Sequence, residues 1–487
     1  MPRENRSRGF DLACLPNRAL LVAIAIFVLE LIIPRQASAL PSFARQTGLG
    51  CGACHTEFPQ LTPFGRRFKI LGYTLGRSVP EDKRVLGYNS PFPSKDQAPS
   101  DTWLPLSAQA IASFTHTATG QDTAGSAPYL KSNDNVELQT ASLFYGGAIT
   151  DHIGAFIQGT YNAQGFGPPA AHLFTWDNLD IRYANTLDLG GMPLVYGVTV
   201  NNNPTVQDPW NTTPAWGYPF TTSNLANTPA AKTLIDQTFA AQVLGIGAYS
   251  FINDQLYLEL AGYQTLNPGA LNSLGVNPEN TLPINGVAPY FRAAFEQQWG
   301  RHSLELGTFG LIAETGLPLA TPGAGTNRFT DIGLDSQYQY RGDGYWVTLR
   351  STYLHENQSL GASVANGLAA NLNNTLNTFR TQASLSYGTD GKVILTGGYF
   401  NTWGSSDAIL YGGNRTFSPN SDGFIGEIAY QFFGKNNAPK LWPWFNARVG
   451  LQYIAYNKFN GASTNFDGNG TNARDNNTLL LYLWTTF

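Results

Sequence analysis

The sequence is poor in charged and sulfur-containing residues, and each scarcity excludes a class of protein. Charged residues make up 13% of the 487 residues, and there are three cysteines and two methionines. So few thiols cannot form the disulfide framework of a small secreted protein. The net charge of −4 gives no support for nucleic-acid binding. Beyond residue 40 no apolar run approaches the roughly 20 residues of a membrane-spanning helix, which leaves a closed β-barrel as the only route through a bilayer.

Residues 1–39 have the pattern of a secretory signal peptide. An apolar run at 19–33 leads to an A-x-A cleavage pattern at 37–39. The alternative, a retained transmembrane helix, is weaker because Glu30 interrupts a run already shorter than about 20 residues. Cleavage would remove Cys14 and leave two thiols in the exported chain. The arginines before the apolar run are Arg3, Arg6, Arg8 and Arg18.

Most of the remaining chain alternates apolar and polar residues in segments of about ten, as strands of a transmembrane barrel do. Phe291 and Phe295, for example, share one face, while Arg292 and Glu296 share the other. Aromatic residues at 13% and 51 glycines suit this architecture. We therefore predict an all-β fold, a transmembrane barrel of about 16 antiparallel strands with an apolar exterior and a polar lumen. The barrel domain is predicted over 101–487, with strands beginning near 103, 136, 153, 173, 193, 241, 255, 288, 303, 329, 344, 376, 391, 422, 444 and 476.

The connections alternate between short and long. Short turns of bacterial barrels face the periplasm and long loops face the outside, and we expect the same arrangement here. A soluble β-sandwich also has many evenly spaced strands, but its long loops would not favour one end. The chain ends in LLLYLWTTF, and Phe487 resembles the terminal aromatic recognised by outer-membrane assembly machinery. Short turns are expected near Asp151, Asn253, Gly300, Gly342 and Asp390, and long loops at 202–240, 266–287, 357–375 and 403–421.

The pentapeptide Cys51-Gly-Ala-Cys54-His55 has the attachment pattern of a c-type haem. In such a motif the two thiols form thioethers to the porphyrin and the histidine ligates the iron. A zinc site needs about four ligands, and no second cysteine pair supplies them. A thioredoxin-like CxxC would require a βαβ context that the sequence lacks. We therefore predict one covalent haem c, with His55 as an axial iron ligand.

The segment 40–100 that carries this motif differs from the barrel in its sequence pattern. Thr62 can cap a short helix with proline at its first position, and Gly72 can stop it. About sixty residues bury too little surface to fold alone, so we expect a plug lodged in the barrel lumen, followed by a proline-rich link. The apolar stripe of this helix either serves only packing, or covers a haem edge while the basic residues of the helix approach the propionates. The stripe is Phe64, Phe68 and Leu71, and the basic residues are Arg66, Arg67 and Lys69.

The sixth haem ligand stays open, and so does the pairing of charges in the lumen. The histidines and methionine outside the motif are more simply read as ordinary polar or turn residues than as ligands. The inward-facing charges either pair with one another or dock the plug. The ligand candidates are Met192, His116, His152, His172, His302 and His355. The predicted lumen charges are Arg292, Arg350, Arg380, Arg448, Glu259, Glu296, Glu305 and Glu427.

The run ARQTGLGCGACHTEFPQLTPFGRRFKILGYTL, over residues 43–76, resembles the cytochrome segment of the fused monohaem cytochrome–porins, the outer-membrane iron-oxidising cytochromes of Fe(II)-oxidising bacteria. The rest of the chain resembles that family only in length, barrel pattern and terminal phenylalanine. The resemblance implies that extracellular Fe(II) is oxidised and that a periplasmic c-type cytochrome accepts the electron. Of the family's site residues, only Cys51, Cys54 and His55 can be transferred to this chain.

We therefore expect an iron:cytochrome c oxidoreductase in the outer membrane of a Gram-negative bacterium. The sequence has no serine-triad order, no phosphate-binding glycine loop and no His–carboxylate metal cluster. Ferrous ion needs no tight site, because it only has to approach the haem edge. Two alternatives remain open. One is the same build with another donor, such as a sulfur compound or a mineral, or with reversed direction. The other is a solute-conducting porin whose haem segment is regulatory or structural.

Overall fold

The computed structural model describes residues 40–74, 105–121, 130–161, 174–321, 323–389, 391–432 and 444–487. The predicted signal at 1–39, most of the proline-rich link and His172 lie outside the described residues. Within the described part, no helix is long and apolar enough to cross a membrane.

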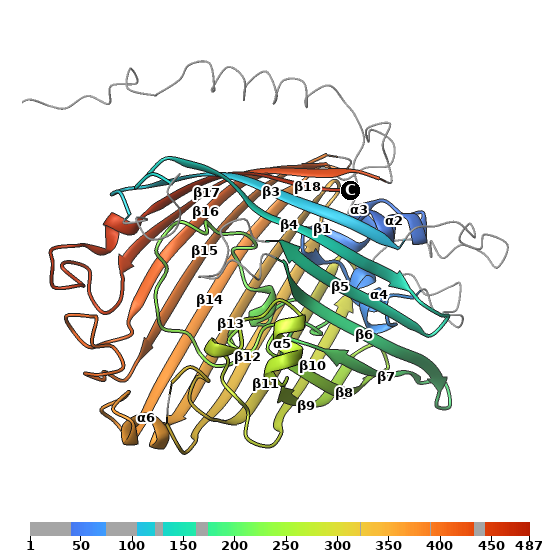
Figure 1. The fold of residues 1–487 in the computed structure, drawn as a ribbon. Helices are drawn as coiled ribbons and strands as arrows, with labels where there is room; N and C mark the ends of the chain where they lie inside the picture. Colours follow the sequence, from blue (N-terminus) through green and yellow to red (C-terminus); the bar gives the residue numbers. More distant parts are fainter. Residues whose placement is uncertain are drawn as a thin grey trace, which may run out of the picture.

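Sixteen antiparallel strands form one closed barrel, which confirms the predicted fold class (Figure 1). Each strand pairs with its neighbours in the chain, and β18 closes the ring by pairing with β3 from Thr478↔Thr117 to Thr486↔Gln109. Every predicted strand start lies within three residues of an observed one. The strands are β3 Leu106–Thr117, β4 Asn135–Ala148, β5 Ile153–Tyr161, β6 Phe174–Asp188, β7 Pro193–Asn201, β8 Val243–Ile252, β9 Leu256–Thr265, β10 Ala288–Trp299, β11 His302–Thr315, β12 Asn327–Arg341, β13 Tyr345–Ser359, β14 Asn373–Tyr387, β15 Gly391–Gly404, β16 Ser421–Phe432, β17 Asn446–Lys458 and β18 Thr478–Thr486.

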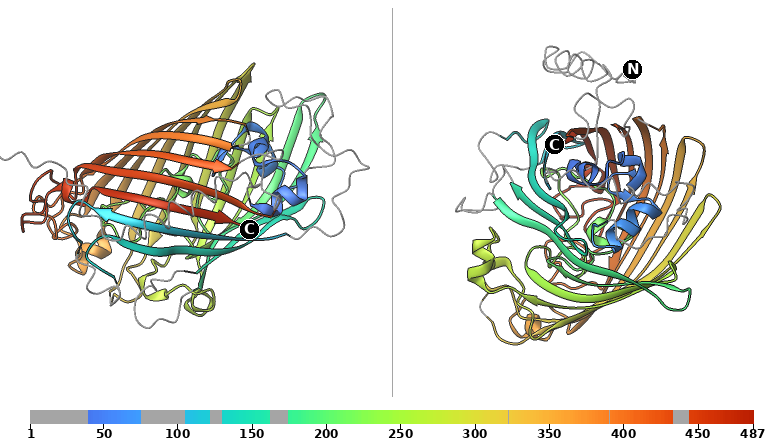
Figure 2. Two further views of the ribbon diagram at one scale, coloured as in Figure 1. Left: turned by 90° about the horizontal axis from the view of Figure 1, so that it is seen from above. Right: turned by 90° about the vertical axis from the view of Figure 1, so that its right-hand side faces the viewer.

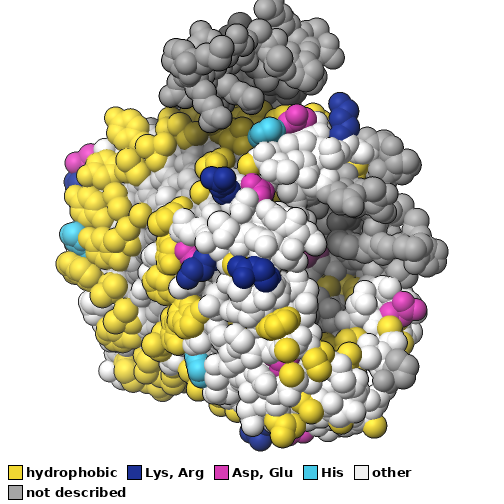
Figure 3. All heavy atoms as spheres, turned by 90° about the vertical axis from the view of Figure 1, so that its left-hand side faces the viewer, with side chains coloured by type: hydrophobic (Ala, Val, Ile, Leu, Met, Phe, Trp, Pro, Cys, Tyr) yellow, Lys and Arg dark blue, Asp and Glu magenta, His cyan; other side chains and the backbone are white. Residues whose placement is uncertain are grey.

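The period-two alternation of the sequence becomes an apolar exterior and a polar lumen. Leu260 is 71% exposed on the outer face, while its neighbour Glu259 is 2% exposed inside. Large apolar side chains cover the flank of the barrel, and the long-loop end is mostly neutral and polar (Figure 3). A lipid-facing apolar wall around a polar interior, with an even number of strands, is the architecture of a bacterial outer-membrane barrel.

The N-terminal segment 40–74 lies inside one mouth of the barrel (Figure 2). Its α4 begins after Thr62, whose hydroxyl accepts the backbone N–H of Gly65 at 3.2 Å, as predicted. The chain then reverses at Gly72, where φ is 69°. The plug occupies the short-turn end, because Gly52 and the turns at 300–301 and 342–344 line one cavity. Its elements are α2 Pro41–Thr47, α3 Cys51–Cys54, β1 His55–Glu57, β2 Gln60–Leu61 and α4 Pro63–Ile70.

The connection 202–242 corrects the expectation of a long outer loop. It leaves β7 at the long-loop end but turns into the lumen, where Trp210 is fully buried. The polarity that suggested solvent instead serves hydrogen bonds inside the barrel, since buried polar groups need partners. Of the remaining short helices, η2 Pro214–Trp216 belongs to this connection, and the others lie in connections at the long-loop end: α5 Pro268–Ser273, η3 Pro278–Asn280, α6 Gly361–Ala365 and η4 Ala473–Asn476.

Candidate cofactor site

Cys51, Cys54 and His55 line one cavity of about 470 Å³ between the plug, the barrel wall and the inner loop 202–242. Ligand pockets typically have volumes of roughly 300–1,000 Å³. The lining includes many aromatic side chains together with Gln158, Asp177 and other polar residues. The aromatic side chains are Phe43, Phe58, Phe68, Tyr73, Phe144, Phe156, Trp216, Phe220 and Trp484. A cavity of this size with aromatic and polar lining residues suits a large flat macrocycle with a polar edge.

The two cysteines lie on α3, a single helical turn, and both are free thiols. Burial raises the pKa of the Cys54 thiol to about 12, so the unmodified thiol is neutral. Gly65 on α4 lies directly against this turn, because a Cβ there would be 2.2 Å from the Cys54 carbonyl oxygen. The sequence offered no signal for this close approach. It leaves no room for a side chain between α4 and the attachment motif.

His55 is held in a hairpin with the nitrogen needed for iron binding left free. Its Nδ1 is 3.2 Å from the Gln60 carbonyl oxygen, which can only accept a hydrogen bond. The proton is therefore assigned to Nδ1, and Nε2 keeps its lone pair. Burial lowers the pKa of His55 to about 4, which keeps the imidazole in its neutral, metal-binding form. The Phe58 ring packs edge-on against it, with centroids 4.8 Å apart.

The barrel wall anchors this hairpin through backbone carbonyls and one ion pair. Lys392 on β15 donates to the Thr56 carbonyl at 2.9 Å, and Arg448 on β17 donates to the Phe58 carbonyl at 2.9 Å. Arg448 also pairs with Glu57 at 3.1 Å and with Glu427 of β16. Both readings of the lumen charges are therefore right here: Arg448 pairs with a wall carboxylate and docks the plug.

The basic residues of α4 have different roles, and two do not approach the cavity. Arg66 binds both oxygens of Glu296 at 2.6 and 3.1 Å, and Arg67 pairs with Asp254. These two arginines fix the plug to the barrel. The expectation that they approach the haem propionates is therefore corrected for both. The residues of the predicted apolar stripe on α4 also differ in whether they reach the cavity. Phe68 lines the cavity, whereas Phe64 and Leu71 are buried outside its wall.

Lys69 joins the plug to the inner loop and also lines the cavity. Its ammonium donates to the carbonyls of Val206 and Asp208, each at 2.8 Å, and to Asn211 Oδ1 at 3.0 Å. It also lies 4.6 Å from the Trp216 ring centroid. Burial and the nearby Arg182 lower the pKa of Lys69 to about 7.

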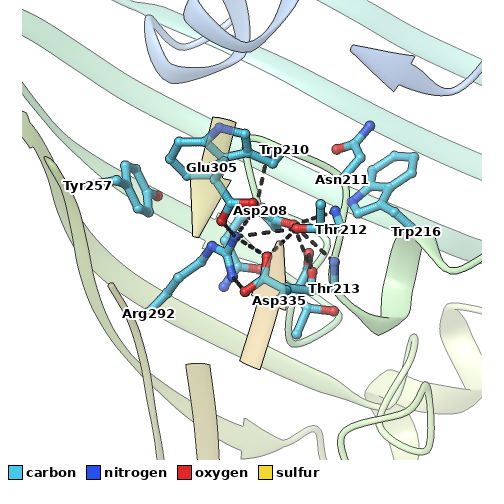
Figure 4. A network of polar contacts seen from close by, with 12 residues as sticks. Asp208, Trp210, Asn211, Thr212, Thr213, Trp216, Tyr257, Arg292, Glu305 and Asp335 are labelled. Carbon is cyan, nitrogen blue, oxygen red and sulfur yellow. Dashed lines mark hydrogen bonds and ion pairs between the residues drawn. The ribbon is translucent and has the colours of Figure 1, made fainter. Parts of the chain in front are cut away.

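A second network fixes the inner loop to the wall, and Figure 4 shows it at close range. Arg292 on β10 pairs with Asp335 at 2.8 Å, Asp208 at 3.1 Å and Glu305 at 3.3 Å. Asp208 in turn accepts backbone N–H groups of the loop, including that of Thr212 at 2.8 Å. The loop is therefore built around a buried carboxylate, which explains its burial despite its polarity.

The candidate sixth ligands in the described residues all lie away from the cavity. No second histidine or methionine occurs among its described lining residues. Met192 is 40% exposed in the β6–β7 turn, and His152 Nδ1 is 3.2 Å from the Ala184 carbonyl oxygen. The other three make ordinary polar contacts: His116 with Asp134 at 2.7 Å, His302 with Tyr338 at 2.7 Å and His355 with Asn377 at 2.8 Å.

No protein-family model and no curated protein sequence matches the chain. Solved structures similar to it include OmpT of Vibrio cholerae, 9% identical, with a TM-score of 0.41 over 78% of this chain and 96% of that chain. An anion-selective porin from Comamonas acidovorans is 13% identical, with a TM-score of 0.42 over 78% and 98% of the two chains. Salmonella typhi OmpF is 12% identical, with a TM-score of 0.44 over 78% and 97%. TM-scores this low support no conclusion about the function of this chain. The barrel fold is established by the strand pairing of the chain itself.

Proposed function

We propose that the protein is a one-electron conduit of the outer membrane, an iron:cytochrome c oxidoreductase of the cytochrome–porin type. It would oxidise extracellular Fe(II) and reduce a periplasmic c-type cytochrome, one electron at a time. Residues 1–39 would direct export, 40–100 would carry the haem, and 101–487 would form the barrel. The donor and acceptor come from the sequence resemblance, and the haem comes from the attachment motif.

One observation carries the proposal: the complete attachment motif lines a large aromatic cavity within the barrel. Cys51 and Cys54 would hold the porphyrin covalently, and His55 Nε2 would ligate the iron. When bound, the haem supplies reversible one-electron chemistry, with a potential set by ligands, hydrogen bonding and burial. Gln60 orients His55, Lys392 and Arg448 fix the hairpin, and the aromatic side chains limit access of water.

The filled lumen favours a conduit over an open pore. The plug occupies the short-turn mouth, and the inner loop lies directly against it through Lys69 and through Asn211, which donates to the Pro59 carbonyl at 3.0 Å. A solute would have to displace both segments. Liposome swelling tests this alternative, because a porin with a regulatory haem would admit sugars and a plugged barrel would not.

The decisive experiment mixes the purified haem-loaded protein anaerobically with Fe(II) and follows the haem absorption bands in a stopped-flow spectrometer. We expect rapid reduction, followed by reoxidation when an oxidised periplasmic cytochrome is added. Sulfur compounds and a mineral suspension serve as competing donors. If the haem stays oxidised with Fe(II) and is reduced by another donor, the conduit has a different substrate. If a reduced cytochrome reduces the haem and Fe(III) removes its electron, the direction is reversed.

A further inference from the structure

Arg350 differs from every other arginine that projects into the described lumen. Five of these arginines have a carboxylate within ion-pair distance, whereas Arg350 forms no ion pair with any described residue. The Nη2 of Arg350 donates a hydrogen bond to the Trp216 carbonyl oxygen at 3.2 Å. The paired sets are Arg66–Glu296, Arg182–Asp180, Arg292 with Asp208, Glu305 and Asp335, Arg380–Asp236, and Arg448 with Glu57 and Glu427.

Arg350 is nonetheless buried, at 5% exposure, and lines a separate small cavity. Among the described residues, neither its Nε nor its Nη1 has a hydrogen-bond partner. Gln382, directly opposite it in the β13–β14 register, is 6% exposed and has no described partner for Nε2. Tyr218 lines the same cavity, and its hydroxyl also has no described partner.

The carboxylates that act on Arg350 from a distance are engaged by other arginines, since Glu57 pairs with Arg448 and Glu305 pairs with Arg292. Asp236 pairs with Arg380, which borders the cavity, and Arg292 holds Asp208 and Asp335. A buried cation that no carboxylate contacts directly is destabilising. Three unpartnered hydrogen-bond donors around one cavity have the polarity that an anion requires.

We propose that this cavity binds one small, singly charged inorganic anion of the size of chloride, through Arg350, Gln382 and Tyr218. Its volume of about 30 Å³ decides the size class. One water-sized sphere needs at least about 10–15 Å³ on the same scale, so the space suits a monatomic ion and excludes a nucleotide or lipid head group. The proposal does not depend on the cofactor or on iron oxidation.

An anion here would act on the cofactor cavity through a shared chain segment. Arg350 holds the Trp216 carbonyl, Gly217 lines both cavities, and Trp216 and Phe220 form part of the aromatic wall. The ion would neutralise the guanidinium and fix the segment 216–220 against the wall. The anion site is thus a structural support of the cofactor cavity from the side of the inner loop.

Bromide diffraction tests the site directly. Crystals of the haem-loaded protein grown without halide are soaked in sodium bromide, and data are collected at the bromine absorption edge. We expect an anomalous peak among Arg350, Gln382 and Tyr218. Ordinary water density, or occupation of the cavity by a carboxylate of the cofactor, would overturn the proposal.

A solution measurement asks whether the ion binds below crystal concentrations. The unfolding temperature of the haem-loaded protein is followed as sodium chloride replaces sodium gluconate at constant ionic strength. We expect a saturable rise, and in Arg350→Gln an apparent affinity lower by about tenfold or more, as loss of a charged hydrogen bond implies. Arg328→Gln, at an exposed arginine of β12, is the matched control. An unchanged response in Arg350→Gln would refute the site, and if that variant does not fold the bromide map decides alone.

Discussion

The two sides of the plug meet the barrel in different ways. The side facing β10–β17 is fixed by charge: Arg66 binds Glu296, and Glu57 binds Arg448, all of them at most 3% exposed. The side facing β3–β6 is joined to the wall by hydrogen bonds from neutral groups of the plug, such as Ser42 N–H to Ser107 Oγ at 3.0 Å and Tyr73 Oη to Asp180. It also borders the cavity that Phe43 and Phe68 of the plug line together with Phe144 of the wall.

This difference separates the fixing of the plug from the role that we propose for the cavity, which is to hold a cofactor. Ion pairs between buried partners are directional, and they fix the position of the plug against one wall. Aromatic side chains around a cavity accept a flat group without specifying its contacts one by one. Substitutions on the two sides should therefore have different consequences.

The largest effect is expected from removing the attachment chemistry on the cavity side. Cys51→Ser with Cys54→Ser should abolish covalent haem, while the ion pairs opposite keep the plug docked. Haem staining after denaturing electrophoresis measures attachment, and heat-modified migration measures barrel folding. Cys14→Ser is the matched control, and it should retain full staining if residues 1–39 are removed on export. Full staining of the double variant would refute the haem assignment.

On the docked side, Arg448→Met should cost about 3–5 kcal/mol, because Glu57 and Glu427 would remain buried without their cation. Denaturant unfolding followed by tryptophan fluorescence measures the loss. The plug should also become sensitive to protease in this variant. Arg301→Gln removes an exposed ion pair at a turn and should leave stability close to wild type. Equal effects of the two substitutions would mean that the plug is not held by buried charge.

Where the plug meets the inner loop, Lys69 should make stability depend on pH. Burial lowers its pKa from 10.5 to about 7, so the unfolded chain binds a proton that the folded chain lacks between these values. Stability should therefore rise with pH through this window, by up to about 1.4 kcal/mol per pH unit. Lys69→Met should flatten the slope, measured by denaturant unfolding from about pH 6.5 to 10.5. Lys458→Met, at an exposed lysine, should retain the slope, and an unchanged slope in Lys69→Met would contradict the assignment.

The smallest effect is expected from thinning the aromatic wall. Phe156→Ala should admit water beside the proposed haem and lower its reduction potential, because greater solvent exposure favours the ferric state. We expect a shift on the order of 59 mV, which corresponds to a tenfold change for one electron. Redox titration followed in the visible bands measures it. The outward-facing Phe424→Ala is the control, and a shift there of equal size would remove the link to the cavity.

Strand number and strand positions were predictable because alternation with a period of two is a local property. A residue such as Leu260 must face lipid if Glu259 faces the lumen, wherever the strand lies in the barrel. The helix beginning at Pro63 was predictable for the same reason, since its cap and its first proline are neighbours in sequence. The inner loop was not, because its polar composition is equally compatible with water and with a buried network around Asp208.

The sequence alone determined the attachment motif, the strand pattern and the cap of the plug helix, because each depends on residues close together in the chain. Only the tertiary structure decided that Arg66 and Arg67 dock the plug while Lys69 reaches the cavity. It also decided that Gly65 lies against Cys54 and that Arg350 has no carboxylate among its contacts. Apart from Gly65 and Cys54, the residues that meet here are more than a hundred positions apart in the chain, and they come together only when the sheet closes and both segments enter the lumen.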